Sequence, residues 1–292
     1  MAQCKTTKLT TTIIDELRLC YTAESSLLNE FGQMKIGENI RLHDYMIYRV
    51  RKERFEYGFD VMTDIDTRVA QLYFGHKCEV DDDNRYIWLR AENATLYNSA
   101  LLKDVIIDVA DLLDLKFCHI TSMDLAKDFT KNTTYTIDKL LRNKNITTIL
   151  NNKAIKNRRE ELKGLGMWHS RSLDRICNPT LYIKQRKAIH DKSQGICVTS
   201  YNKLAEINES QKQYILEFYN NPKRLHRLEV HQNTAEIKDY CAARNIEQTI
   251  DLIFDNDFLT DMYFYHLGAV LRFTEGRKRL AWSDILRCSH RV

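Results

Sequence analysis

The feature that most constrains the fold is a two-residue alternation of apolar and polar side chains in four separate segments. They are YIWLRAEN at 86–93, ITSMDLAKDF at 120–129, VTSYNK at 198–203 and HRLEVHQ at 226–232. Successive side chains of a strand point to opposite faces of a sheet, so each segment has one apolar and one polar face. Antiparallel sheets commonly bury one face and leave the other in water. The four segments therefore predict a sheet of this kind.

The other segments predict helices and further strands around this sheet. We expect strands at 40–50 and 180–184 and a hairpin of 55–62 with 68–74. Apolar residues at helical spacing predict helices at 10–32, 101–115, 135–165 and 203–220, and a mainly helical region from 234 that ends in a basic tail, with GRKR at 276–279. Only two prolines and nine glycines occur, so long flexible linkers are not expected. The fold class predicted is α+β with a central, mainly antiparallel sheet.

Composition restricts the class of protein only loosely. The 44 basic residues exceed the 40 acidic ones by four, which permits a nucleic-acid partner without requiring one. None of the eight cysteines forms a pair with the two-residue spacing of a zinc or redox motif, so a reducing, cytoplasmic location is predicted. The sequence shows no signal peptide and no apolar run long enough to span a bilayer, so no membrane partner is expected.

The polar faces of the four segments carry an unusual set of side chains. The set is Glu92, Asp124, Asp128, Glu229, His231, Tyr201 and Lys203. Any one of them could be an ordinary charged residue on a wet sheet face. Together, the acids offer the oxygen ligands that a hard divalent cation prefers, and a tyrosine beside such a cation indicates phosphoryl transfer.

The chemistry of a tyrosine nucleophile requires activation, because a phenol has a pKa near 10. A metal ion or Lys203 would stabilise the phenolate, and the metal would also neutralise charge on the phosphate under attack. The product would be a covalent phosphotyrosine and a free hydroxyl. Because that bond retains the energy of the phosphodiester, strand transfer and rejoining would need no nucleotide cofactor.

Four short motifs carry a resemblance to a known family. In chain order they are RAEN at 90–93, MDLAKDF at 123–129, YNKLAE at 201–206 and RLEV at 227–230. Their order resembles that of the Rep_trans-type rolling-circle replication initiators of plasmids and phages, and of the related conjugative relaxases. The resemblance extends over about residues 40–235, and the ordered set is more specific than any of the motifs alone.

The resemblance implies a metal-dependent tyrosine DNA endonuclease that initiates rolling-circle replication. It implies that Tyr201 is the nucleophile, assisted by Lys203, and that Mg²⁺ or Mn²⁺ is held by some of Glu92, Asp124, Asp128 and Glu229. The fold implied is HUH-endonuclease-like or relaxase-like, with helices packed on one face of the sheet. The nicking domain would occupy residues 1–235, and 236–292 would form a helical extension packed on it or used for dimerisation.

The implied partner is origin DNA with a hairpin or single-stranded nick site, with a homodimer and a host helicase as further partners. The basic residues expected to contact DNA are Arg90, Lys184, Arg186, Lys187 and Arg227. The basic segments 153–163, 184–192 and 276–291 could follow phosphates, or they could be solvated charged surfaces.

The chain departs from the family pattern in places that concern substrate contacts more than the nucleophile. Met123 and Thr199 stand where an arginine or a similar residue is common, and Lys184–Lys187 replaces a segment that often contains Gly-Ser. Tyr182 is the best rival nucleophile, and His231 is an extra metal ligand, a proton carrier or an exposed strand histidine. The alternative functions are a conjugative relaxase and a DNA-binding protein on the same fold that does not cleave.

Overall fold

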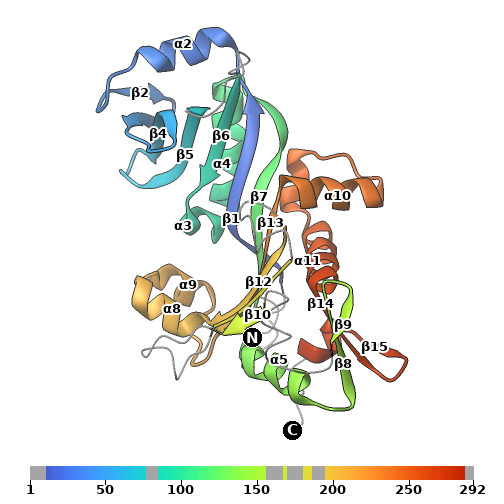
Figure 1. The fold of residues 1–292 in the computed structure, drawn as a ribbon. Helices are drawn as coiled ribbons and strands as arrows, with labels where there is room; N and C mark the ends of the chain where they lie inside the picture. Colours follow the sequence, from blue (N-terminus) through green and yellow to red (C-terminus); the bar gives the residue numbers. More distant parts are fainter. Residues whose placement is uncertain (1–10, 77–84, 156–166, 170–179, 186–194, 287–292) are drawn as a thin grey trace. The chain divides into compact units, whose positions relative to one another are not determined.

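A computed structural model describes residues 11–76, 85–155, 167–169, 180–185 and 195–286 (Figure 1). Its contacts divide the chain into two units, which are described separately. Unit 1 is Met1–Ile13, Asp124–Arg244 and Asp255–Val292, and unit 2 is Ile14–Met123 and Asn245–Phe254. Helices and a large antiparallel sheet confirm the predicted α+β class. Within the described ranges, no helix is long and apolar enough to cross a membrane.

Unit 2 is built on an antiparallel sheet with strand order β7-β1-β6-β5-β4-β3-β2. The strands are β1 (Ile13–Thr22), β2 (Asn39–Leu42), β3 (Tyr45–Val50), β4 (Phe55–Thr63), β5 (Arg68–His76), β6 (Tyr86–Ala91) and β7 (Lys116–Phe129), which passes into unit 1 after Met123. The helices are α2 (Ser25–Gln33), α3 (Asn93–Leu96), α4 (Ser99–Leu112) and the 3₁₀ helix η2 (Ile250–Phe254). Helix α4 begins at the cap residue Asn98, whose side chain accepts a hydrogen bond from the Leu101 amide, and it buries Leu102, Val105 and Val109 at helical spacing.

Unit 1 contains two sheets. Its main sheet has strand order β10-β11-β12-β13-β7, and the small sheet has order β15-β14-β8-β9. The strands are β8 (Ile146–Leu150), β9 (Lys153–Ile155), β10 (Met167–His169), β11 (Leu181–Lys184), β12 (Cys197–Asn202), β13 (His226–Asn233), β14 (Leu271–Glu275) and β15 (Lys278–Leu280). The helices are α5 (Thr133–Arg142), α8 (Lys203–Ser210), α9 (Gln213–Phe218), α10 (Thr234–Arg244), α11 (Asn256–Val270) and α12 (Trp282–Leu286).

The apolar face of the main sheet of unit 1 lies against α5 and α11. The hydroxyl of Tyr263 on α11 donates a hydrogen bond to the Leu228 carbonyl of β13, at 3.1 Å. The hydroxyls of Thr133 and Thr134 on α5 lie 2.8 and 2.9 Å from the Ser200 hydroxyl of β12. These two helices therefore fix strands β12 and β13, whose opposite face carries the candidate site.

Most of the predicted strands and the helix at 101–115 are confirmed, but the predicted helix at 10–32 is wrong. Its first part is strand β1, which pairs with β6, and only Ser25–Gln33 is helical. Leu17, Leu19 and Tyr21 are buried at a spacing of two, as in a strand. Ile14, Leu17 and Tyr21 also lie three and four residues apart, so the same segment fits the apolar spacing of a helix. The predicted strand at 40–50 is two strands, β2 and β3, that form a hairpin with His43 at φ 50°.

The predicted helix at 135–165 is also wrong beyond its first turns. Helix α5 ends at Arg142, and the chain then forms the hairpin of β8 and β9. The two turn residues, Asn151 and Asn152, have φ 49° and 63°, a conformation that asparagine adopts more readily than most residues and that two-residue hairpins require. Residues 156–166 of the predicted helix lie outside the described residues.

The region from 234 onward is helical in α10, η2, α11 and α12, but it also contains the β14–β15 hairpin. The GRKR segment at 276–279, predicted as part of a basic tail, is therefore the turn and second strand of a sheet. The predicted boundary between a nicking domain ending at 235 and an extension beginning at 236 stays a prediction.

A buried histidine gives unit 1 an expected pH dependence. His266 on α11 is 2% exposed, contacts the Gln232 side chain, and has its pKa lowered to about 4 by burial. The unfolded chain would take up a proton near pH 6.5, whereas the folded protein resists doing so until about pH 4. We therefore expect stability to fall by roughly 3 kcal/mol between these pH values. Denaturant unfolding at several pH values should show that His266→Gln removes this slope while the exposed His43→Asn retains it; equal slopes in both variants would contradict the prediction.

Candidate active site on the polar sheet face

The register of the strands in unit 1 places the predicted residues of β12 and β13 on one face. Strands β12 and β13 are antiparallel, with Tyr201 opposite Arg227 and Thr199 opposite Glu229. On the next strand, Tyr182 lies opposite Thr199. Since directly opposite residues of neighbouring strands share a face, the rival nucleophile Tyr182 is on the same face as Tyr201.

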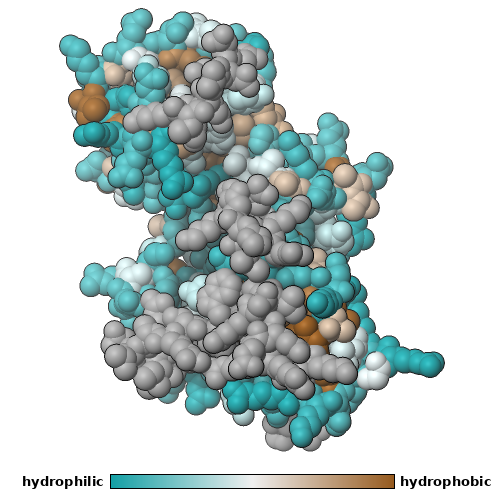
Figure 2. Space-filling model, viewed as in Figure 1, coloured by the Kyte–Doolittle hydropathy of each residue, from teal (hydrophilic) through white to brown (hydrophobic). Residues whose placement is uncertain are grey.

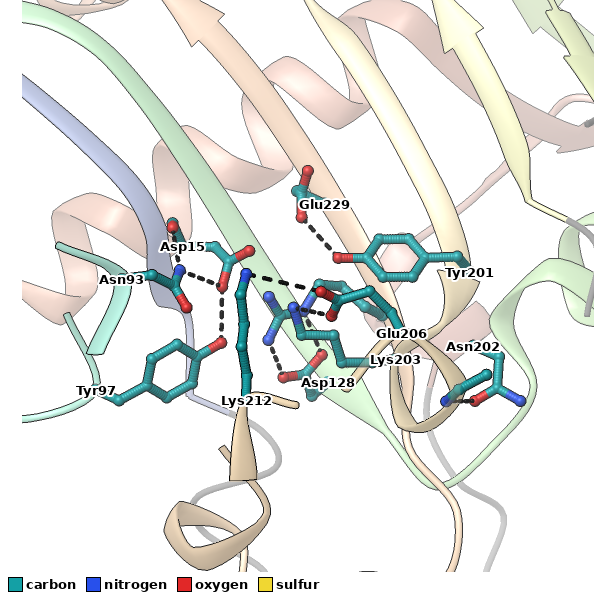
Figure 3. Close-up of polar contacts among 12 residues, drawn as sticks. Asp15, Asn93, Tyr97, Asp128, Tyr201, Asn202, Lys203, Glu206, Lys212 and Glu229 are labelled. Carbon is teal, nitrogen blue, oxygen red and sulfur yellow. Dashed lines mark hydrogen bonds and ion pairs between the residues drawn. The ribbon is translucent and has the colours of Figure 1, made fainter. Parts of the chain in front are cut away.

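Tyr201 lies at the end of β12, where the strand leads directly into α8. Its phenolic hydroxyl donates a hydrogen bond to Glu229 Oε2 at 3.1 Å (Figure 3). The Lys203 ammonium lies 5.8 Å from the centre of its ring. Helix α8 begins here because the Asn202 side chain accepts a hydrogen bond from the Ala205 amide, at 3.1 Å. The half-buried phenol therefore has an acceptor for its proton and a cation beside its ring.

Asp124 and His231 form a second pair on this face. The Asp124 carboxylate contacts His231 Nδ1, and His231 Nε2 lies 3.2 Å from the Asn233 side-chain oxygen. The side chains of Asp124 and His231 are 15% and 31% exposed, so both remain accessible to solvent. A carboxylate on one imidazole nitrogen orients the ring and favours a proton on that nitrogen. Asp124, Glu229 and Tyr201 are thus brought to one face of the sheet, as the alternation predicts.

Asp128 is arranged differently, because it is buried in a closed network. Its two oxygens accept hydrogen bonds from Arg227 Nε and Nη2 at 2.8 and 2.6 Å, and Oδ2 also accepts one from the Tyr219 hydroxyl at 2.7 Å. The side chains of Asp128 and Arg227 are both 0% exposed. This geometry favours a structural ion pair over the metal and DNA contacts predicted for these two residues.

Lys203 is held by a neighbour on its own helix. Its Nζ lies 2.7 Å from Glu206 Oε2, one helical turn along α8, and its side chain is 1% exposed. Lys212 Nζ lies 3.7 Å from the other oxygen of Glu206. Burial alone would raise the pKa of Glu206, but the two lysines bring it below the usual value. Glu206 is therefore the carboxylate that pairs with the buried Lys203 beside the Tyr201 ring.

Two predicted residues, Glu92 and Arg90, belong to unit 2. Glu92 Oε1 lies 2.9 Å from Arg68 Nε, and Arg90 Nη2 lies 4.0 Å from Glu16 Oε2. Both predicted residues thus pair with groups of their own unit.

The remaining predicted DNA contacts lie in and after β11. Lys184 is the last residue of this strand and pairs with Cys197 of β12 in the antiparallel register. Its backbone carbonyl accepts a hydrogen bond from the Asn151 side chain at 3.0 Å. Arg186 and Lys187 lie outside the described residues.

Sequence reasoning missed two partners of the site residues. Glu206 was recognised only as part of a motif, although its three-residue spacing from Lys203 on a helix is a signal for an ion pair. The contact of Tyr219 with Asp128 had no signal, because 91 residues separate the two in the chain.

In the present arrangement, the side chains on the polar face of unit 1 provide only part of the ligand set of a metal ion. Among the residues that the structure describes, no three His, Cys, Asp or Glu side chains form a metal-binding group. The donor chemistry of Asp124, Glu229 and His231 nevertheless suits Mg²⁺ or Mn²⁺, because carboxylate oxygens are the ligands such cations prefer. Asp128 fits less well, since Arg227 and Tyr219 already occupy its oxygens.

Comparison with known proteins does not identify a family for this chain. The sequence matches no protein-family model, and a search of curated proteins finds no match.

Proposed function

We propose that this protein nicks DNA through a covalent tyrosine intermediate and thereby initiates rolling-circle replication. The observation that carries the proposal is the hydrogen bond from the half-exposed Tyr201 hydroxyl to Glu229, beside the buried Lys203. A phenol paired with a carboxylate and a cation is the arrangement that an activated tyrosine nucleophile needs. The resemblance of the four ordered motifs to Rep_trans-type initiators supports the same reaction.

Several residues of the polar face have separate roles in the proposed reaction. Glu229 accepts the phenolic proton through the hydrogen bond that already joins the two groups. The Tyr201 oxygen then attacks the backbone phosphorus, one phosphorus–oxygen bond breaks, and the sugar oxygen leaves as a hydroxyl after taking up a proton. Positive charge on Lys203, 5.8 Å from the ring centre, favours the phenolate over the phenol. A return attack by a sugar hydroxyl would rejoin the strand and release Tyr201.

A divalent ion is part of the proposal. Asp124 and Glu229, with His231 beside them, are the residues that would hold Mg²⁺ or Mn²⁺. Such an ion would neutralise the charge that develops on the phosphate. The Asp124 carboxylate also orients His231, which keeps the imidazole on the same face as Tyr201.

The proposal extends to the finer fold and to the partner. A tyrosine at the end of an antiparallel strand, with its acids on the neighbouring strands, supports an HUH-endonuclease-like or relaxase-like arrangement. The substrate would then be origin DNA with a single-stranded or hairpin nick site, and the nicking domain would end near residue 235. A conjugative relaxase would use the same chemistry on a different element.

The test is the formation of a covalent protein–DNA adduct. The protein is incubated with labelled single-stranded DNA and with supercoiled DNA that carries candidate origins, in Mg²⁺ or Mn²⁺, and denaturing electrophoresis detects label on the protein. The proposal expects an adduct together with a nicked strand. Binding to these DNAs without cleavage in either metal would favour the alternative, a DNA-binding protein on the same fold.

Glu229→Gln should slow nicking because glutamine cannot accept the phenolic proton. General-base catalysis typically contributes 10²–10⁴-fold, so we expect a loss of about 10²-fold or more in the single-turnover rate of adduct formation. Titration of Mn²⁺ separates this role from that of a metal ligand: the loss of a base persists at saturating metal, whereas the loss of a ligand is partly restored. Thr199→Val, at the position opposite Glu229, is the control. If Glu229→Gln nicks DNA at the wild-type rate, Glu229 is neither the general base nor a metal ligand.

A further inference from the structure

The β14–β15 hairpin of unit 1 is a short ribbon at the edge of the small sheet. Glu275 pairs with Lys278, which leaves Gly276 and Arg277 as a two-residue turn. Gly276 has φ 58°, and glycine at the first turn position is typical of the type II′ turns that suit hairpins. The sheet order places β15 at one edge, with β14 between it and β8.

The small sheet concentrates the positive charge of the chain. Residues 146–155 and 271–280 contain five basic residues and one acidic residue: Lys153, Arg272, Arg277, Lys278, Arg279 and Glu275. The complete chain has 44 basic and 40 acidic residues. The excess of four positive charges in this sheet therefore equals that of the whole chain, and the remaining residues balance. In Figure 2 the hydrophilic projection at the lower right corresponds to the place that Figure 1 labels β15.

Three of these cations are available to a partner. Arg277, Lys278 and Arg279 are exposed, and within the described part of the chain none of them forms an ion pair. Charged residues on an edge strand also prevent pairing with another sheet. Three consecutive unpaired cations at the end of a hairpin suit a polyanion as well.

The base of the hairpin is held firmly. Phe273 is 0% exposed and its ring packs edge-on against Trp282, with centroids 5.7 Å apart. Trp282 Nε1 donates a hydrogen bond to the Leu271 carbonyl at 3.0 Å, and Arg272 Nη2 donates one to the Asn152 side-chain oxygen at 2.6 Å. The exposed end of the hairpin is therefore presented by a fixed base, which lowers the entropy lost on binding.

We propose that this hairpin binds the sugar–phosphate backbone of double-stranded DNA, independently of sequence. The width of a two-stranded ribbon fits the major groove of B-DNA, and arginine and lysine side chains provide contacts to phosphate. The inference rests on the proposed function for the identity of the polyanion as DNA, and it specifies the duplex part of that substrate. Neutralisation of phosphates releases counterions, so binding through these residues depends steeply on salt.

The test compares two variants that lose the same charge. One carries Arg277→Gln, Lys278→Gln and Arg279→Gln; the control carries Lys35→Gln, Arg51→Gln and Lys103→Gln, three exposed residues of unit 2. Fluorescence anisotropy measures binding to a duplex of arbitrary sequence between 50 and 200 mM salt, conditions over which phosphate-driven affinity changes strongly, and we expect the hairpin variant to bind at least about 10-fold more weakly and to lose roughly 2–3 from the log–log salt slope. The control should stay close to wild type.

Several outcomes would overturn the inference. Unchanged duplex affinity and salt slope would exclude the hairpin as a DNA contact, and so would a variant that only aggregates more while binding DNA normally, which indicates edge protection. A loss confined to a single-stranded probe would point to a different ligand. Because Arg279 lies close to Gly268 of α11, the single variants Arg277→Gln and Lys278→Gln serve if the triple variant does not fold; each should reduce the slope by about 1.

The result is separable from the nicking proposal. Adduct formation on a short single-stranded oligonucleotide depends on Tyr201 and not on the hairpin. Hairpin-dependent duplex binding by a protein that never forms an adduct would leave this inference standing and refute the proposed function. If the adduct forms normally and duplex binding does not depend on the hairpin, the proposed function stands and this inference is refuted.

Discussion

Tyr201→Phe is expected to abolish the covalent protein–DNA adduct and to reduce nicking by at least about 10³-fold, since removal of a nucleophile has some of the largest effects known in enzymes. The variant loses only the hydroxyl that donates to Glu229, and its ring can keep its contact with Lys203. The fold should therefore be retained. Single-turnover assays with labelled DNA in Mg²⁺ or Mn²⁺ measure both quantities, and circular dichroism with thermal unfolding verifies the fold.

The matched control is Tyr182→Phe. Tyr182 lies on the neighbouring strand β11 and, through its pairing with Thr199, on the same face as Tyr201. It is therefore the strictest comparison available, with the same chemical change in the same sheet. If Tyr182→Phe removes the adduct and Tyr201→Phe retains it, the reaction class survives and the nucleophile assigned here is wrong. If both variants still form the adduct, neither tyrosine is the nucleophile.

The sequence predicted which face of the sheet Tyr201 occupies, but it did not predict the partner of its hydroxyl. Alternation within one strand assigns each side chain to a face, so the polar faces of β12 and β13 follow from local sequence. The contact with Glu229 depends on how two strands 28 residues apart align, and a shift of one residue in register would move Glu229 to the other face. Register is a property of the folded sheet, which a single sequence does not display.

The errors in the predicted fold have a similar origin. In strand β1 the apolar residues Ile14, Leu17 and Tyr21 fit helical spacing, and only the pairing with β6 identifies the segment as a strand. The β8–β9 hairpin depends on Asn151 and Asn152 adopting positive φ, a turn signal inside a stretch that otherwise reads as a basic helix. In both places contacts made far along the chain override local helical spacing.

Burial distinguishes Asp128 from Asp124, which charge alone does not. On the polar face, the sequence gives the same weight to Asp124 and Asp128. In the fold, Asp124 is partly exposed beside His231, whereas Tyr219 and Arg227 enclose Asp128. The enclosing tyrosine comes from the end of α9, a region that the sequence does not connect with this strand. Neutralising Asp128 is therefore expected to lower the stability of the fold strongly, whereas neutralising Asp124 is expected to change it little.

Asp128→Asn is expected to lower the free energy of unfolding by about 3–5 kcal/mol, the usual cost of removing one partner of a buried ion pair. Asparagine occupies nearly the same volume, but its amide carries no charge, so the fully buried Arg227 guanidinium is left without a counter-charge. Its amide group also presents hydrogens where the carboxylate accepted bonds from Arg227 and Tyr219. Urea unfolding at neutral pH, followed by circular dichroism, measures the change.

Asp124→Asn is the control, because Asp124 lies on the same strand and the same face but remains partly exposed. A stability change below about 1 kcal/mol is expected there, as for most ion pairs in contact with solvent. If Asp128 instead binds a metal, Asp128→Asn would leave the stability of the metal-free protein nearly unchanged. Wild type alone would then gain stability as Mg²⁺ or Mn²⁺ is added, because a ligand that binds only the folded state stabilises it in proportion to the logarithm of its concentration. The dependence of unfolding on metal in the two variants thus separates a structural carboxylate from a metal ligand without any measurement of nicking.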